Sequence, residues 1–268
     1  MYLSTLRIFL PFLLLAAAAT IPVLATPLTF VGSGIGTGGN AISATVTFDF
    51  GTHDFGSGAV NAVRVSVTNT AASTLLRGNL ITGVFFSLSG GVGNLPTVSA
   101  GFDGLAALVA LADGSTTTNV DIAPAVNSTA TEGGYQLSNG PFGLANDGSD
   151  FSGFRYGIST VGSGLTGFSG AAVNGDNYGI FAAGSATTSG GMASARPLID
   201  TTAVFWIARP VQWVTLFQLG TSVRVTYGSR PDNFITATAN GVPEPSTLSM
   251  LGVAVAMAAI SRRWRRSR

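Results

Sequence analysis

The chain of 268 residues carries few charges, since only 9% of its residues are charged, and it contains neither lysine nor cysteine. The absence of cysteine excludes a disulfide framework and thiol chemistry, so stability must come from a packed core. Five of the 13 arginines lie in the last eight residues, and the central part of the chain has more acidic residues than arginines. The basic patch that nucleic acid binding requires is therefore missing, which excludes nucleic acid as a partner.

The N-terminal segment, residues 1–25, has the organisation of a secretory signal peptide. Arg7 precedes the apolar stretch Ile8–Ala19, and the small residues Val23 and Ala25 stand at the −3 and −1 positions of a cleavage site. Signal peptidase accepts small side chains at these positions. We therefore predict export followed by removal of this segment, with a retained membrane anchor as the alternative.

Period-two patterns predict many strands in the body of the chain, residues 26–241. In AISATVTFDF, which starts at Ala41, apolar side chains alternate with Ser, Thr and Asp, as in a strand with one buried face. The segments AVRVSVT, from Ala62, and FRYGIST, from Phe154, repeat this alternation. VFFSLSG, TTAVFWIA and VQWVTLFQL are rich in the aromatic and β-branched residues typical of strands.

Two further segments bear on the fold. The runs VTLFQL and SVRVTYG flank Gly220 and Thr221, a pair that suits the two-residue turn of a β-hairpin. The spacing of apolar residues in FDGLAALVALADG, from Phe102, fits either a helix or a buried strand. Many short strands separated by Gly, Asn and Asp predict one all-β domain, an antiparallel β-sandwich or jelly roll.

Two features of the body resemble functional motifs. GIGTGG has the glycine spacing of a dinucleotide-binding loop at Gly34, Gly36 and Gly39, but a strand follows where that loop requires a helix, so we interpret it as a flexible lead-in. His53 is the only histidine and has glycines nearby on both sides, which predicts a turn residue. With one histidine, no cysteine and no G-x-S-x-G sequence, neither a zinc site nor a serine triad is expected, and no cofactor is predicted.

Oxygen-bearing side chains gather in NDGSDFSG, with Asp147 and Asp150, and in NGDNYG, with Asp176. Calcium binds such oxygens in exported β-proteins, but neither segment follows the EF-hand order, and Asn-Gly and Asp-Gly also form ordinary turns. A glycosidase needs two carboxyl groups at a defined separation, and Glu132 is the only glutamate of the body before the C-terminal segment. Calcium binding and a pair of catalytic aspartates therefore stay as alternatives.

The C-terminal segment, residues 242–268, contains three elements in order. A rigid Pro-Glu-Pro sequence at Pro243, Glu244 and Pro245 precedes an apolar segment over 248–260 and a final cluster of five arginines. The apolar segment makes about 20 Å of helix, which is shorter than the ~30 Å hydrocarbon core, so flanking residues must extend the predicted transmembrane span. Because arginines stay on the cytoplasmic side, the body is predicted to lie outside.

This tail resembles the PEP-CTERM sorting signal of exported proteins in Gram-negative bacteria. In that family exosortase, an integral-membrane enzyme similar to transpeptidases, recognises the Pro-Glu-Pro element. The resemblance implies that Pro243, Glu244 and Pro245 are the recognition residues, that segment 248–260 is a transient membrane anchor, and that the arginines stop transfer across the membrane. An ordinary tail anchor is the alternative.

The resemblance also implies a destination, because genes for such proteins accompany exopolysaccharide production. Our first hypothesis is an exported, exosortase-processed protein of the cell surface or biofilm matrix, without enzymatic activity, whose neutral polar faces and exposed aromatic residues contact exopolysaccharide or neighbouring copies. The expected partners are signal peptidase, exosortase, the membrane during transit, and exopolysaccharide. A secreted carbohydrate-active enzyme and a calcium-dependent glycan-binding module are the alternatives.

Overall fold

The computed structural model of the protein describes residues 27–54, 58–72, 76–89, 105–112, 117–122, 135–140, 142–162, 164–168, 175–183, 198–208, 218–219 and 222–240. The predicted signal peptide, residues 1–25, and the predicted sorting segment, residues 242–268, lie outside the described residues. In this described part of the chain, no helix is long and apolar enough to cross a membrane.

Strands are the main secondary structure of the described residues, which also include one short 3₁₀ helix (η1, Arg77–Asn79). The strands are β1 (Leu28–Ile35), β2 (Ala41–Asp54), β3 (Ala59–Asn69), β4 (Ile81–Phe86), β5 (Leu88–Ser89), β6 (Leu105–Ala112), β7 (Thr117–Ile122), β8 (Gln136–Asn139), β9 (Tyr156–Ser159), β10 (Ile180–Phe181), β11 (Leu198–Ala208), β12 (Gln218–Leu219), β13 (Ser222–Tyr227) and β14 (Phe234–Ala239).

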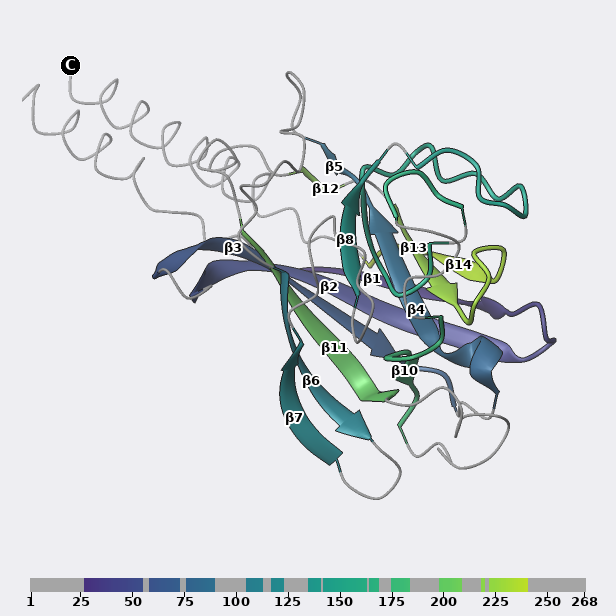
Figure 1. The fold of residues 1–268 in the computed structure, drawn as a ribbon, viewed down its shortest axis with the longest axis horizontal. Helices are drawn as coiled ribbons and strands as arrows, with labels where there is room; N and C mark the ends of the chain where they lie inside the picture. The colour runs from purple at the N-terminus through teal and green to yellow at the C-terminus, as the bar shows by residue number, and fades with distance from the viewer. Residues whose placement is uncertain are drawn as a thin grey trace, which may run out of the picture.

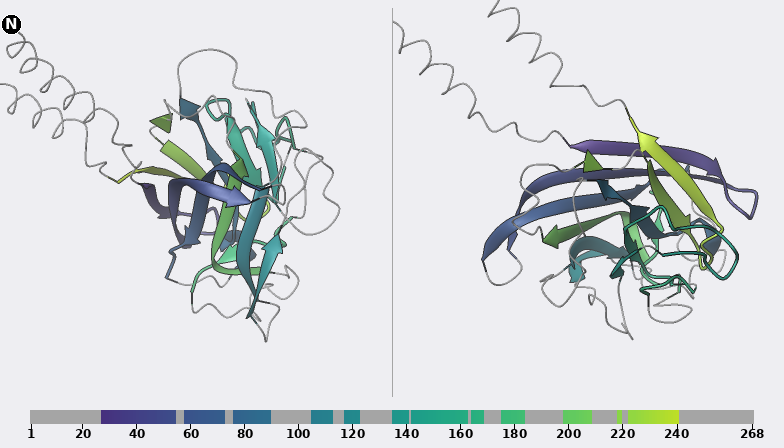
Figure 2. Two further views of the ribbon diagram at one scale, coloured as in Figure 1. Left: turned by 90° about the vertical axis from the view of Figure 1, so that its left-hand side faces the viewer. Right: turned by 90° about the horizontal axis from the view of Figure 1, so that it is seen from above.

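Twelve of the strands belong to one sheet, in the order β7-β6-β11-β3-β2-β1-β14-β13-β4-β9-β8, while β12 and β5 form a separate pair (Figure 1). The strand β10 lies off this path and pairs with both β11 and β4. Its pairing with β11 is the only parallel one among the described strands. Because β10 links two strands far apart in the sheet order, the sheet must curl back on itself, as the views in Figure 2 show.

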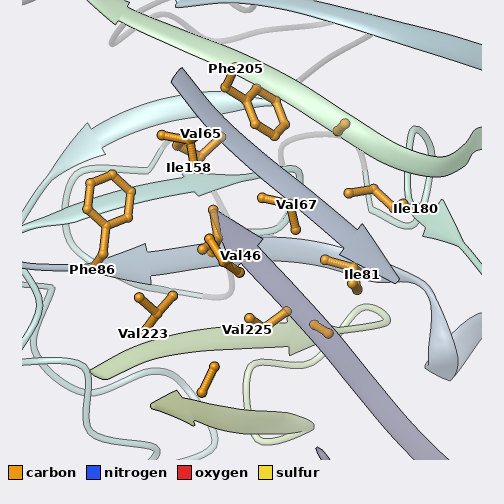
Figure 3. Close-up of a cluster of buried hydrophobic side chains, with 14 of the residues drawn as sticks. Val46, Val65, Val67, Ile81, Phe86, Ile158, Ile180, Phe205, Val223 and Val225 are labelled. Atoms are coloured by element: carbon orange, nitrogen blue, oxygen red, sulfur yellow. The ribbon is translucent and has the colours of Figure 1, made fainter. Parts of the chain in front are cut away.

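The main core lies between the two halves of this curled sheet. On one side, Val46, Val65 and Phe205 come from β2, β3 and β11, and on the other side Phe86 and Val225 come from β4 and β13 (Figure 3). Each of these side chains is at most 1% exposed. Burying an apolar side chain of this size stabilises a protein by about 1.5–3 kcal/mol, so the contact between the two halves holds the sheet in its curled form.

A second apolar cluster covers the outer surface of β4 and β9. Phe85 points outward from β4 and packs against Phe142 and Phe151, which lie between β8 and β9, and against Phe168, which follows β9. A Cβ atom at Gly157 of β9 would lie 2.8 Å from the ring of Phe85, so glycine is required for this close approach. The strand β9 is consequently buried on both faces, whereas alternation in FRYGIST predicts one exposed face.

The sequence-based prediction of an all-β body is confirmed, and so are the strands expected in AISATVTFDF and AVRVSVT. The segment FDGLAALVALADG, which fits either a helix or a strand, forms the strand β6 between β11 and β7. The jelly-roll or two-sheet sandwich arrangement is not confirmed. Strand pairs β1–β2 and β1–β14 join the two halves into one continuous sheet.

The predicted hairpin around Gly220 and Thr221 is wrong. Strand β12, before this pair, belongs to the small separate sheet with β5, whereas β13, after it, pairs with β14 and β4 in the large sheet. Both edges of β13 are thus occupied by other strands, so a local turn preference is overridden by pairing with distant segments.

The last three glycines of GIGTGG lie in the turn of a β-hairpin between β1 and β2, whereas Gly34 belongs to β1. The backbone N–H of Gly39 donates to the carbonyl of Gly36 at 2.8 Å, and Gly39 has a φ of 77°, a conformation that favours glycine. The strand β2 begins directly after this turn, at Ala41. A strand therefore follows the glycines, as predicted, although the segment is a tight turn and not a flexible lead-in.

Candidate binding face

The outer surface of β2, β3 and β11 presents a regular array of polar side chains. Inward-facing residues of these strands form the core, so the alternate residues point outward, and all of them are half-buried or exposed. The strand register aligns them in rows across the sheet. The rows are Thr45, Thr68 and Thr202; Thr47, Ser66 and Val204; and Asp49, Arg64 and Trp206.

Hydroxyl groups contact one another across the strands of this face. The hydroxyl oxygens of Thr29 and Thr47 lie 3.1 Å apart, and those of Thr68 and Thr202 lie 2.9 Å apart. Each hydroxyl has one donor and two acceptor positions, so one such contact does not exhaust its capacity for hydrogen bonds. The face can therefore still bind a ligand that carries hydroxyl groups.

An aromatic pair lies at one end of this face. The rings of His53, on β2, and Trp206, on β11, are stacked with centroids 4.9 Å apart and planes 9° apart. The strand β3 runs between β2 and β11, so the pair spans three strands. A Cβ atom at Gly51 would lie 3.6 Å from the indole ring, which shows that Trp206 extends across the sheet as far as β2.

A guanidinium group completes this cluster, which we call the Trp206 cluster (His53, Arg64 and Trp206, with Asp49 beside them). The Cζ atom of Arg64 lies 6.0 Å from the centroid of the indole ring, within the range of a cation–π contact. Asp49 and Arg64 are direct neighbours across the β2–β3 pair, so positive and negative charges adjoin at this end of the face. The cluster combines the half-buried aromatic rings of His53 and Trp206 with one basic and one acidic side chain.

The prediction that His53 is a turn residue is wrong, because β2 continues through Gly51 and Thr52 to Asp54 and His53 is paired with Val60 of β3. The alternation in TTAVFWIA places Trp206 opposite the buried Phe205 and Ile207, so the sequence contained a signal for its outward position. The partnership with His53 depends on the order of three strands that are distant in sequence.

The predicted calcium-binding residues Asp147 and Asp150 stabilise the loop in which they lie. The carboxylate of Asp147 accepts the backbone N–H of Ser149, and that of Asp150 accepts the backbone N–H of Ser152, both at 2.8 Å. The hydrogen bond from the backbone of Ser152 lowers the pKa of Asp150. These contacts are typical of Asx turns, the alternative that Asp-Gly and Asn-Gly sequences suggest.

The same loop is fixed to the outer surface of the sheet by Arg224. Its guanidinium lies 4.6 Å from the ring centroid of Phe151 and 4.1 Å from that of Phe234, and its Nη1 atom donates to the main-chain oxygen of Asp150. Desolvation lowers the pKa of Arg224, yet an arginine keeps its charge in folded proteins. Arg224 thus anchors the loop by charge-assisted contacts.

Asp176 is located differently, since only 4% of it is exposed. Its Oδ2 atom lies 2.7 Å from Nη2 of Arg77, in η1, and its Oδ1 atom has no hydrogen-bond partner among the described residues. Burial raises the pKa of Asp176, and the attraction of Arg77 counteracts part of this effect. No group of three or more His, Cys, Asp or Glu side chains suited to a metal ion occurs within the described ranges.

Comparison with known proteins identifies the tail. Residues 241–266 match the family model of the PEP-CTERM protein-sorting motif, so the predicted resemblance is confirmed. The match includes Pro243, Glu244 and Pro245, which lie outside the described residues. No curated protein and no solved structure matches the chain. The chain therefore carries the sorting motif of exported proteins that exosortase processes, and the match is confined to the tail.

Proposed function

We propose that this protein is held in the membrane by segment 248–260, released by exosortase through Pro243, Glu244 and Pro245, and then acts at the cell surface or in the extracellular matrix. Its role there is structural or adhesive, and its body binds exopolysaccharide through the Trp206 cluster and the adjoining hydroxyl-rich face. The matched sorting motif supports the export and processing steps.

The Trp206 cluster is the observation that supports glycan binding. Sugar rings have apolar C–H faces that pack on aromatic rings, and their hydroxyl groups exchange hydrogen bonds with polar side chains. Trp206 and His53 supply the aromatic surface, and Arg64 and Asp49 supply a donor and an acceptor next to it. Tryptophan, arginine and tyrosine dominate the binding energy of protein interfaces, so a ligand at this position would depend on Trp206.

The chemistry of the remaining face favours a neutral or weakly charged polysaccharide. Thr45, Thr47, Ser66, Thr68 and Thr202 carry hydroxyl groups in two successive rows beside the cluster. An array of hydroxyls can bind a chain of sugar units, each by a few hydrogen bonds. The proposal assigns no catalytic role to the body, since Asp147 and Asp150 bind their own loop and Asp176 is paired with Arg77.

The proposal is tested by measuring binding of the mature protein, purified from its host, to exopolysaccharide from the same cells. Trp206→Ala should weaken binding at least about tenfold, which corresponds to about 1.4 kcal/mol. Leu144→Ala is the matched control, because Leu144 is 65% exposed and lies on the segment that covers the other half of the sheet. Equal binding by both variants and the wild type would contradict the assignment of this face.

A further inference from the structure

The chain enters and leaves the described fold at the same end of the sheet. Strand β1, the first, and strand β14, the last, pair with each other, with Phe30 opposite Ala239 and Val31 opposite Thr238. The backbone N–H of Asn240 donates to the carbonyl of Thr29 at 2.9 Å. Figure 2 shows the purple β1 and the yellow-green β14 side by side. Asn240, the last described residue before the sorting motif, therefore lies beside the start of β1.

The last strand is also an internal strand of the sheet, because β14 lies between β1 and β13. Ile235 and Ala237 of β14 are buried in the main core. A Cβ atom at Gly32 of β1 would lie 2.9 Å from the Cα atom of Ala237, so the two backbones are in close contact. The core is therefore incomplete until β14 has inserted.

The length of the connecting chain allows this to happen while the precursor is still anchored. Residues 241–247 separate the last described residue, Asn240, from the apolar segment that begins at Leu248. Seven extended residues span at most about 25 Å. This length lets β14 pair fully outside the membrane. It also keeps the end of the sheet where β1 begins and β14 ends close to the membrane surface.

We propose that exosortase acts on the folded body, and that the end of the sheet where β1 begins and β14 ends is the surface that contacts the enzyme. The inference rests on the proposed retention by segment 248–260 and on recognition at Pro243, Glu244 and Pro245. These residues follow Asn240 by at most five positions, or about 18 Å of extended chain. An enzyme that binds them must therefore approach this end of the sheet closely.

The experiment uses a pair of introduced cysteines in a chain that has none. Val31→Cys and Thr238→Cys are directly opposite on the outer face, and both positions are exposed, so a bridge between them leaves the core unchanged. Opposite residues of antiparallel strands have Cα atoms about 4.5–5.5 Å apart, which suits a disulfide. The double variant and each single variant are produced as full chains in the native host and followed by pulse labelling.

Precursor and mature forms are separated by size with and without reducing agent. We expect the bridge in the double variant to form already in the precursor, and the bridged precursor to be processed as fast as either single variant. A bridge that appears only after processing, or a bridged precursor that is not processed, would overturn the inference. If the wild-type chain itself shows no conversion from precursor to a shorter form, the proposed processing fails instead, so the two failures are distinguishable.

Discussion

Replacing Asn69 by leucine should destabilise the body strongly, because this one amide joins three parts of the fold. Asn69 ends β3 and is only 2% exposed. Its side-chain N–H groups donate to the carbonyl of Asn79, in η1, at 3.0 Å and to the carbonyl of Ile180, in β10, at 2.9 Å. The amide therefore helps to hold β10 where it closes the curled sheet.

The magnitude follows from the two carbonyl groups that would lose this donor. Leucine has the branched shape of asparagine and a larger volume, so Asn69→Leu removes the hydrogen bonds without opening a cavity. A buried polar group left without a partner costs about 1–3 kcal/mol, so the free energy of unfolding should fall by about 2–6 kcal/mol. In a domain of this size each kcal/mol lowers Tm by roughly 2–4 °C, so Tm should fall by at least about 4 °C.

The assay is thermal unfolding of the mature protein, followed by circular dichroism. Asn61→Leu is the matched control, since Asn61 lies on the same strand but is exposed, and surface substitutions change stability by about 0.5 kcal/mol or less. If Asn69→Leu and Asn61→Leu had the same Tm as the wild type, the role of Asn69 in closing the sheet would be refuted.

Two further predictions concern stability. Gly83→Ala should lower the free energy of unfolding by about 1–3 kcal/mol, because a Cβ atom there would lie 2.6 Å from Oγ1 of Thr226 and 2.7 Å from Oγ of Ser159. Gly153 has open space around it, so Gly153→Ala should leave the free energy of unfolding, measured in urea, unchanged. Burial raises the pKa of Asp176 above 3.8, so the folded state binds its proton more tightly than the unfolded chain. The free energy of unfolding should therefore decrease as the pH rises from about 4 through the folded-state pKa, and Asp176→Asn should remove this decrease; an unchanged slope in urea titrations would refute the assignment.

The alternation of apolar and polar residues predicted correctly those strands that are buried on one face only. In β2 and β3 the inward positions Val46, Phe48, Val65 and Val67 are all buried, as the alternation indicates. The pattern is informative here because the outward residues of both strands are half-buried or exposed. Where another segment covers the outer surface, as Phe142 covers Gly157 of β9, alternation no longer describes burial.

Where the local sequence fits more than one secondary structure, pairing with distant segments determines which one forms. The apolar run that forms β6 suits a helix as well as a strand, and it is a strand because β11 and β7 pair with it on either side. Gly220 and Thr221 suit a hairpin turn, but of the two flanking strands β12 pairs with β5, and β13 pairs with β4 and β14.

The candidate site, too, was predictable from local sequence only in part. The outward position of Trp206 follows from its own strand, but its stacking on His53 requires the order β2-β3-β11, which no local pattern specifies. The sorting motif, in contrast, is defined by a linear sequence, and it was therefore identified from the sequence alone.

The central claim, that exosortase removes the tail of this protein after export, is tested most directly by the intact mass of the protein at the surface of its native host. The account predicts a mature form that has lost the C-terminal arginine cluster, and a Glu244→Ala variant that is exported but keeps its full C-terminus and stays in the membrane fraction. Mature surface protein that still carries Arg262 to Arg268 would contradict the account.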